Sequence, residues 1–243
     1  KDDWHTLLNP QVKTPRTITL LRGQYQFALN SNGTCCRFIL VDENVFINAL
    51  FPATTTDTTT PIGAAEHAGE MTQHDLSTLL LPNTFLYEGT PANCCVLGFH
   101  SFDFEPLGNI GLGQAYVMDY ASWISPGLFG ASFTDVTALS HEISEAFNDP
   151  LVAFDGVHNI TPWWLAPNGL CQNNLETGDV IEGLPNATFP MTLNGFTYHP
   201  QNEALLPWFA FQSNSTALGG AYSYPNTSVL TGPSAPQGVN CGQ

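Results

Sequence analysis

Basic side chains are scarce in this sequence. Only 5 of its 243 residues are Lys or Arg, against 21 Asp and Glu, and the formal net charge is −16. Charged residues make up 11% of the chain, whereas an average soluble domain has about 25%, so the acidity reflects missing bases rather than extra acids. Binding to DNA or RNA depends on Lys and Arg that neutralise phosphates. We therefore exclude nucleic acid as a partner, and anionic membrane surfaces as well.

Long apolar runs and linkers are also missing. No apolar stretch approaches the roughly 18–20 residues that a membrane span needs. The shares of hydrophobic (43%) and aromatic (12%) residues are high enough for a sizeable core and argue against disorder. The 21 Gly and 18 Pro are spread through the chain and mark no boundary between two halves. We therefore expect one domain over residues 1–243, and a monomer.

Cysteine usage predicts disulfide bonds. The six cysteines are an even number, which favours disulfides, and no C-x-x-C pair is present, which argues against a zinc knuckle. The neighbours Cys94 and Cys95, like Cys35 and Cys36, are each expected to bond elsewhere, because a disulfide between adjacent residues strains the peptide.

Five N-x-S/T sequons add to this argument for a secreted glycoprotein. The chain also opens on a charged segment without an apolar leader, which predicts a mature, already processed form. The acidic, Lys-poor and Thr/Asn-rich composition resembles that of secreted fungal proteins. The predicted glycosylation sites are Asn32, Asn159, Asn186, Asn214 and Asn226.

The coarse secondary structure mixes strands with few helices. Residues 73–81, followed by Pro82, predict a short helix. From about residue 156 onward Gly, Pro and Asn are frequent, which predicts irregular loops and short strands held by Cys171 and Cys241. We interpret His100 as a strand residue that faces either the core or a cleft, with the core favoured. Runs of β-branched and aromatic residues predict strands at residues 17–21, 37–41, 84–87, 95–99 and 114–120.

The most informative segment is a predicted helix over residues 134–150. Thr134 or Asp135 can cap its start, and Pro150 ends it because the residue before a proline disfavours helical geometry. Apolar residues recur at spacings of three, four and four and predict the face that packs on the core: Val136, Leu139, Ile143 and Phe147.

Three residues of this helix predict metal chemistry. His141 and Glu145 are four residues apart, so their side chains lie one turn apart on the same side and can chelate one divalent ion. Glu142 stands where the general base stands in H-E-x-x-H metalloproteases. Here the second histidine is replaced by glutamate, and zinc accepts both ligand types.

A catalytic zinc site needs a third protein ligand in addition to water. One candidate is Asp149 at the end of the helix. The other is the acidic turn over residues 176–179, which carries Glu176 and Asp179. The sequence leaves both open.

Residues 140–150, SHEISEAFNDP, resemble an S-H-E-hydrophobic-x-E-A-x-x-D-P pattern. This pattern occurs in a group of secreted bacterial and fungal proteins that are distantly similar to plant phosphate-induced (exordium-like) proteins. Residues 97–102 look like the G-[YF]-H-S strand of that group, residues 114–118 like the strand that leads to its helix, and residues 176–179 like its E-x-G-D turn. The likeness covers about residues 94–210; the cysteine that often follows the turn is Val180 here.

The resemblance implies a zincin-like α+β domain. It would contain a twisted mixed sheet, an active-site helix, and a loop-rich C-terminal part tied by disulfides. An edge strand at residues 114–120 would lie beside the cleft and could bind an extended peptide by strand addition.

The function that follows is a secreted metal-dependent hydrolase similar to zinc metallopeptidases. Zinc would be held by His141, Glu145 and either Asp149 or Asp179, and would activate a water whose proton Glu142 takes. One alternative is a non-catalytic secreted domain with a structural metal; another is a carbohydrate-active hydrolase that uses paired carboxylates such as Glu142 and Glu176. The expected partner is an extracellular protein, a peptide or a cell-wall polymer.

Overall fold

A computed structural model describes residues 8–29, 36–106, 113–130, 133–152, 164–172 and 174–235. Its class is mixed α+β, as the sequence predicts. One sheet has the order β1-β2-β4-β5, in which β2 and β4 are parallel. Its strands are β1 (Tyr25–Leu29), β2 (Arg37–Asp42), β4 (Thr84–Tyr87) and β5 (Cys94–Val96).

A second sheet lies beneath the candidate site described below. Its order is β3-β7-β6, with β7 parallel to β3 and antiparallel to β6, and the short β8 pairs with the far end of β7. The strands are β3 (Ser77–Pro82), β6 (Gly98–Pro106), β7 (Gly113–Phe129) and β8 (Phe133–Asp135).

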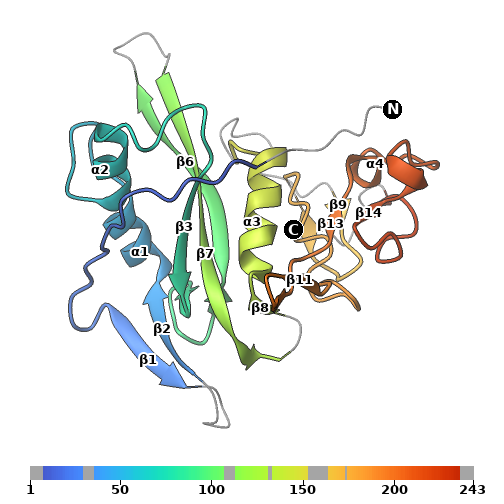
Figure 1. The fold of residues 1–243 in the computed structure, drawn as a ribbon, viewed down its shortest axis with the longest axis horizontal. Coiled ribbons are helices and arrows are strands. Elements are labelled where there is room, and N and C mark those ends of the chain that lie inside the picture. Colours follow the sequence, from blue (N-terminus) through green and yellow to red (C-terminus); the bar gives the residue numbers. More distant parts are fainter. Residues whose placement is uncertain are drawn as a thin grey trace.

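Helices cover both faces of this second sheet. Figure 1 shows α1 (Glu43–Leu50) and α2 (Pro61–His67) on one side and α3 (Thr137–Asn148) on the other. Met118 and Tyr120 of β7 belong to the same buried cluster as Phe46 of α1, whereas Ala121 packs in the cluster of Ala138 from α3. The two faces follow from the period of two along a strand, which sends successive side chains to opposite sides.

The first two helices begin as their sequences lead one to expect. Asp42 caps α1 by accepting from the backbone N–H groups of Asn44 and Val45. Thr60 caps α2, and Pro61 occupies its first turn, where its missing N–H costs no hydrogen bond. In both places the short polar cap residue follows a non-helical segment and fixes where the helix starts.

The predicted metal helix exists as α3, but two details of its prediction are wrong. No side chain caps it: Asp135 instead ends β8, and its Oδ1 accepts from the backbone N–H groups of Val136 and His199. The predicted apolar face is only partly buried: Leu139 packs against the cluster of Ala138, whereas Phe147 is 49% exposed. The buried residues are Thr137, Ala138, Glu142, Glu145 and Ala146.

The burial of Glu142 and Glu145 on α3 has a physical cause in the sheet beneath the helix. His100 of β6 and Asp119 of β7 are cross-strand partners and both are buried. A helix that packs on this polar patch must turn its own polar side chains toward it, because buried polar groups need polar neighbours.

The strand predictions are confirmed at residues 37–41, 84–87 and 114–120, which lie in β2, β4 and β7. The predicted strand 95–99 is divided between β5 and β6. Residues 17–21 form no strand, and the helix predicted at 73–81 is wrong, because that segment contains β3. Burial alternates along β3, and its Leu-rich run pairs with β7 rather than coiling.

The expected edge position of residues 114–120 is wrong for residues 118–120. Strand β7 lies between β3 and β6, and β6 pairs with it from Gly113 to Ala121. Strand β3 pairs with β7 only from Met118 onward, so residues 118–120 are flanked on both sides and cannot accept an added strand, whereas residues 113–117 are paired on the β6 side alone.

The C-terminal part is built from loops and very short strands, as predicted. It has a small core of its own that includes Trp164, Ile181 and Trp208. Its elements are β9 (Trp164–Leu165), β10 (Cys171–Gln172), β11 (Met191–Leu193), β12 (Phe196–Tyr198), β13 (Glu203–Ala204), α4 (Leu206–Phe209), the 3₁₀ helix η2 (Leu218–Gly220) and β14 (Ser223–Tyr224).

The disulfide predictions are partly wrong. Cys94 and Cys95 are bonded to each other across a cis peptide bond, whereas the sequence argument assumed that adjacent cysteines bond elsewhere. Cys171 is disulfide-bonded. Cys35 and Cys241 lie outside the described residues.

Three of the predicted glycosylation sites can be placed. Asn186 and Asn214 are exposed, and Asn226 is half-buried. Asn32 and Asn159 fall outside the described ranges. Within those ranges, no helix is both long and apolar enough to cross a membrane.

Two leucines on neighbouring parts of the structure test the position of the core. Leu86 of β4 is fully buried, whereas Leu80 of β3 is 45% exposed. We expect Leu86→Ala to lower the free energy of unfolding by about 3 kcal/mol, because it leaves a cavity. The matched control Leu80→Ala should cost less than about 1 kcal/mol. Urea denaturation measures both, and equal losses would contradict this core.

Candidate metal centre

The site is built around Glu145 on α3. One turn earlier on the same helix, His141 places Nε2 at 3.1 Å from Glu145 Oε2. The side chain of Glu145 is only 2% exposed and that of His141 12%. The helical spacing of four therefore brings the pair together as the sequence predicts.

A turn from the C-terminal part closes over Glu145. The backbone N–H groups of Gly178 and Asp179 donate to Glu145 Oε1 at 2.9 and 3.2 Å. The side chain of Asp179 reaches back, with Oδ1 at 3.3 Å from His141 Nε2. His141, Glu145 and Asp179 thus bring three possible metal ligand atoms within 4.8 Å of one another. We call them the first group.

The other nitrogen of His141 shows which way its ring is protonated. Nδ1 lies 3.3 Å from Gln201 Oε1, and Gln201 is oriented because its Nε2 donates to the carbonyl of Gly178 at 2.6 Å. The amide oxygen of Gln201 therefore faces the ring and can only accept, so His141 Nδ1 carries a proton. In the neutral ring this leaves the lone pair of Nε2 pointing at Glu145 and Asp179, which is how metal-binding histidines are usually held.

His100 on β6 joins the site from the sheet. Its Nδ1 lies 3.5 Å from Glu142 Oε2, 3.6 Å from Glu145 Oε2 and 4.0 Å from Glu176 Oε2. His100, Glu142 and Glu145 form a second group of possible ligands, which shares Glu145 with the first. Periodicity alone favours a core position for His100. The G-[YF]-H-S likeness is the signal that could have identified it as part of the site.

Two glycines make room for these side chains. A Cβ atom on Gly98 would lie 2.7 Å from Cγ and Oε1 of Glu142. A Cβ atom on Gly178 would lie 2.5 Å from Nδ1 of His141. Larger residues at either position would displace a member of the site, because such distances are shorter than van der Waals contact.

Burial controls the charges in this site. It raises the pKa of Glu142, and together with the charge of Glu145 it raises the pKa of Glu176 to about 10. Burial also opposes ionisation of Glu145, but the neighbouring His141 holds its pKa at about 2. Burial disfavours the charged form of His141 as well, yet Glu145 and Asp179 raise its pKa well above 6.5. The site therefore attracts positive charge, either protons or a cation.

The remaining candidate ligand, Asp149, makes hydrogen bonds outside the first group. Its Oδ2 accepts from the backbone N–H of Leu175 at 3.1 Å, and its carbonyl oxygen lies 3.1 Å from His100 Nε2. Its carboxylate belongs to neither group, so of the two candidates for a third ligand only Asp179 lies beside both His141 and Glu145.

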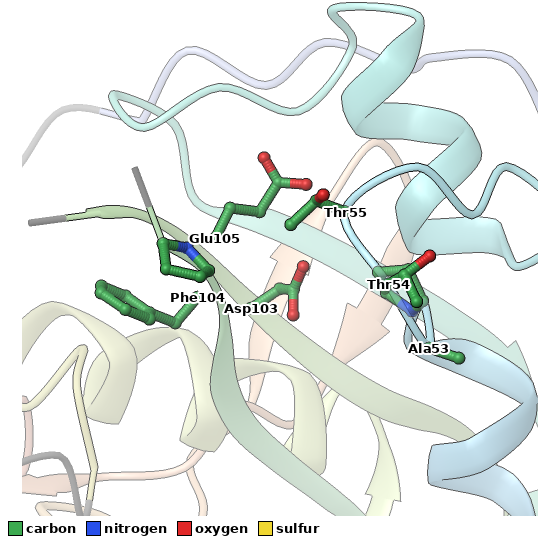
Figure 2. Close-up of a pocket in the computed structure, with 8 residues that line it drawn as sticks. Ala53, Thr54, Thr55, Asp103, Phe104 and Glu105 are labelled. Atoms are coloured by element: carbon green, nitrogen blue, oxygen red, sulfur yellow. The ribbon is translucent and has the colours of Figure 1, made fainter. Parts of the chain in front are cut away.

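A separate acidic cluster lies on the opposite face of the second sheet. It consists of Glu66, Asp103 and Glu105. Asp103 and Glu105 are odd-numbered residues of β6, so they point away from the side of His100. They line a pocket together with Thr54 and Thr55 (Figure 2). This cluster contains no histidine and shares no residue with the first group.

Comparisons with known proteins identify no relative of this chain: no family model, no curated protein and no solved structure matches it.

The contact between Gly178 and His141 gives a test of the site. We expect Gly178→Ala to weaken the binding of Zn²⁺ about 10- to 100-fold, the usual effect of displacing the support of a metal ligand. Gly232→Ala is a matched control, because a Cβ atom there meets nothing within 4 Å. Zn²⁺ titration of both variants measures the effect. Wild-type affinity in Gly178→Ala would show that His141 does not bind the ion.

Proposed function

We propose that this protein is a metal-dependent hydrolase in which His141, Glu145 and Asp179 hold a divalent ion, most simply zinc. The observation that carries the proposal is the convergence of two carboxylate oxygens on His141 Nε2, at 3.1 and 3.3 Å. Ligands about 2.0–2.1 Å from a tetrahedral zinc are about 3.4 Å apart. The two distances to Nε2 are close to that spacing, and the oxygens of Glu145 and Asp179 lie within 4.8 Å of each other.

The site is open on one side, which supports catalysis over a structural role. The side chain of Asp179 is 35% exposed, whereas Glu145 is almost fully buried. Three protein ligands with a solvent-facing side leave a position for water, whereas structural zinc sites are closed by four protein ligands.

Glu142 is the residue that would take a proton from the attacking water. One of its oxygens lies within 4.8 Å of Glu145, and its raised pKa brings it closer to the range of a general base. When bound, the ion would lower the pKa of the water and polarise the bond to be cleaved. Glu142 would thus act as the general base and the other three residues as metal ligands. These are the roles found in zincin-type peptidases, which the SHEISEAFNDP helix resembles.

The substrate class is part of the proposal. A peptide or protein outside the cell fits the zincin-like helix, although strand addition to β7 is blocked from Met118 onward by β3. We propose secretion on the cysteines and sequons described above. A structural metal and a carbohydrate-active site remain as alternative outcomes of the experiment below.

The first experiment replaces the proposed base. We expect Glu142→Gln to lower kcat/KM for peptide hydrolysis by about 10²- to 10⁴-fold, because the amide cannot take a proton. The variant should still bind an ion at the first group, whereas His141→Ala should lose it. A peptide library, a glycoside panel and metal analysis of the purified chain are the measurements. Full activity in Glu142→Gln, or activity on glycosides without metal, would overturn the proposal.

The second experiment uses pH. Although burial disfavours the charged form of His141, Glu145 and Asp179 raise its pKa well above 6.5, so in the ion-free protein a proton occupies Nε2 at neutral pH. The ion must displace that proton. We therefore expect Zn²⁺ affinity to fall about tenfold for each pH unit below the pKa of His141, beginning above pH 6.5. Affinity that is constant between about pH 6 and 9 would contradict this ligand.

A further inference from the structure

The pair His199–Asp135 gives a reference distance for a histidine and a carboxylate that share a proton. His199 Nδ1 lies 2.7 Å from Asp135 Oδ2, which is the length of a charge-assisted hydrogen bond. The distances from His100 Nδ1 to its carboxylate neighbours are 3.5, 3.6 and 4.0 Å. These oxygens surround His100 without any of them accepting a short hydrogen bond, and they have the spacing of ligands around a common ion.

The proton of His100 is on the far side of the ring. Its Nε2 lies 3.1 Å from the carbonyl oxygen of Asp149. A carbonyl can only accept, so Nε2 carries the proton, and the lone pair of Nδ1 in the neutral ring faces Glu142 and Glu145. His141 is held by Gln201 in the same way. Both histidines thus have the support through the second nitrogen that is typical of metal ligands.

We propose that a second divalent cation binds to His100 Nδ1, Glu142 Oε2 and Glu145 Oε2, with Glu176 at its border, so that Glu145 bridges two ions. The proposal rests on the proposed function for the first ion. It adds that Glu142 is a ligand whenever the second ion is bound. The bridge is possible because Oε1 of Glu145 is taken by two backbone N–H groups, which leaves Oε2 alone to face both histidines.

A buried carboxylate beside the second group gives independent support. Asp119 is fully buried on β7, directly across the ladder from His100, and neither of its oxygens makes a well-formed hydrogen bond. Burial raises the pKa of Asp119 to about 7, and a cation nearby would stabilise its ionised form.

Among the described residues, no lysine or arginine forms an ion pair with the acids of the site. In the described part of the chain, the ion pairs of Glu142, Glu145, Glu176 and Asp179 are formed with histidines alone. A second cation would balance this excess of acids. Hydrolases with two ions about 3.5–4 Å apart use such bridging ligands to hold both sides of the reacting group, and carboxylates with imidazole suit Zn²⁺ and Mn²⁺.

The test is the metal content of the full chain loaded with Zn²⁺ and dialysed. We expect about two equivalents in the wild type and about one in His100→Gln, which keeps the ion at the first group. Glu142→Gln should also bind about one, and it serves as the second variant if His100→Gln fails to fold, which circular dichroism shows. Mn²⁺ in place of Zn²⁺ should give the electron paramagnetic resonance of two coupled ions in the wild type, and that of an isolated ion in either variant.

Asp103→Asn is the matched control, because it removes an acid from the cluster on the other face of the sheet. The control should keep both ions. One equivalent in the wild type that His141→Ala removes and His100→Gln does not would overturn the second cation and leave the proposed function standing. No bound ion at all would overturn both. Two equivalents of which Asp103→Asn removes one, while His100→Gln removes none, would assign the second ion to the opposite face and overturn the proposal.

Discussion

The arrangement of the site depends on the two oxygens of one buried carboxylate. Oε1 of Glu145 accepts from the backbone of Gly178 and Asp179, and Oε2 faces two histidines. The first contact fastens the C-terminal part to α3, and the second connects α3 to the sheet through His100. A carboxylate that is almost fully buried is tolerated only because each oxygen has partners of the right polarity. Glu145 therefore both holds these parts of the fold together and presents a possible metal ligand.

The surrounding structure is fitted to this residue. His100 reaches the site because α3 lies across β6 and β7, and Gly98 on β6 has no side chain that would displace Glu142. Gly178 permits the same close approach to His141 from the other side. Gln201 links the two parts once more, since it binds Ser140, His141 and Gly178 at once. The site is thus assembled from a strand, a helix and a turn that are far apart in sequence.

The sequence was sufficient for the parts of this structure that local patterns determine. The helical spacing of His141 and Glu145 and the β-branched runs of β2, β4 and β7 are local, and the structure confirms them. The buried face of α3 is not local, because it depends on which side chains of the sheet lie below. The pattern of apolar residues pointed to Phe147, but the helix packs on His100 and Asp119 and so buries its acids instead. The choice between Asp149 and Asp179 depended on the same packing.

The shortage of basic residues takes on a more specific meaning in this context. A buried cluster of carboxylates needs counter-charge, and proteins commonly supply it with Arg or Lys. Here the chain has only five such residues, and the acids of the site pair with histidines. Neutral histidine gives a lone pair, not a charge, so two imidazoles cannot balance these acids unless they are protonated or share a cation with them. The distances around both rings exceed that of the proton-sharing pair His199–Asp135. The divalent ions proposed above would supply the missing charge, which in the ion-free site comes from protons on His141 and Glu176.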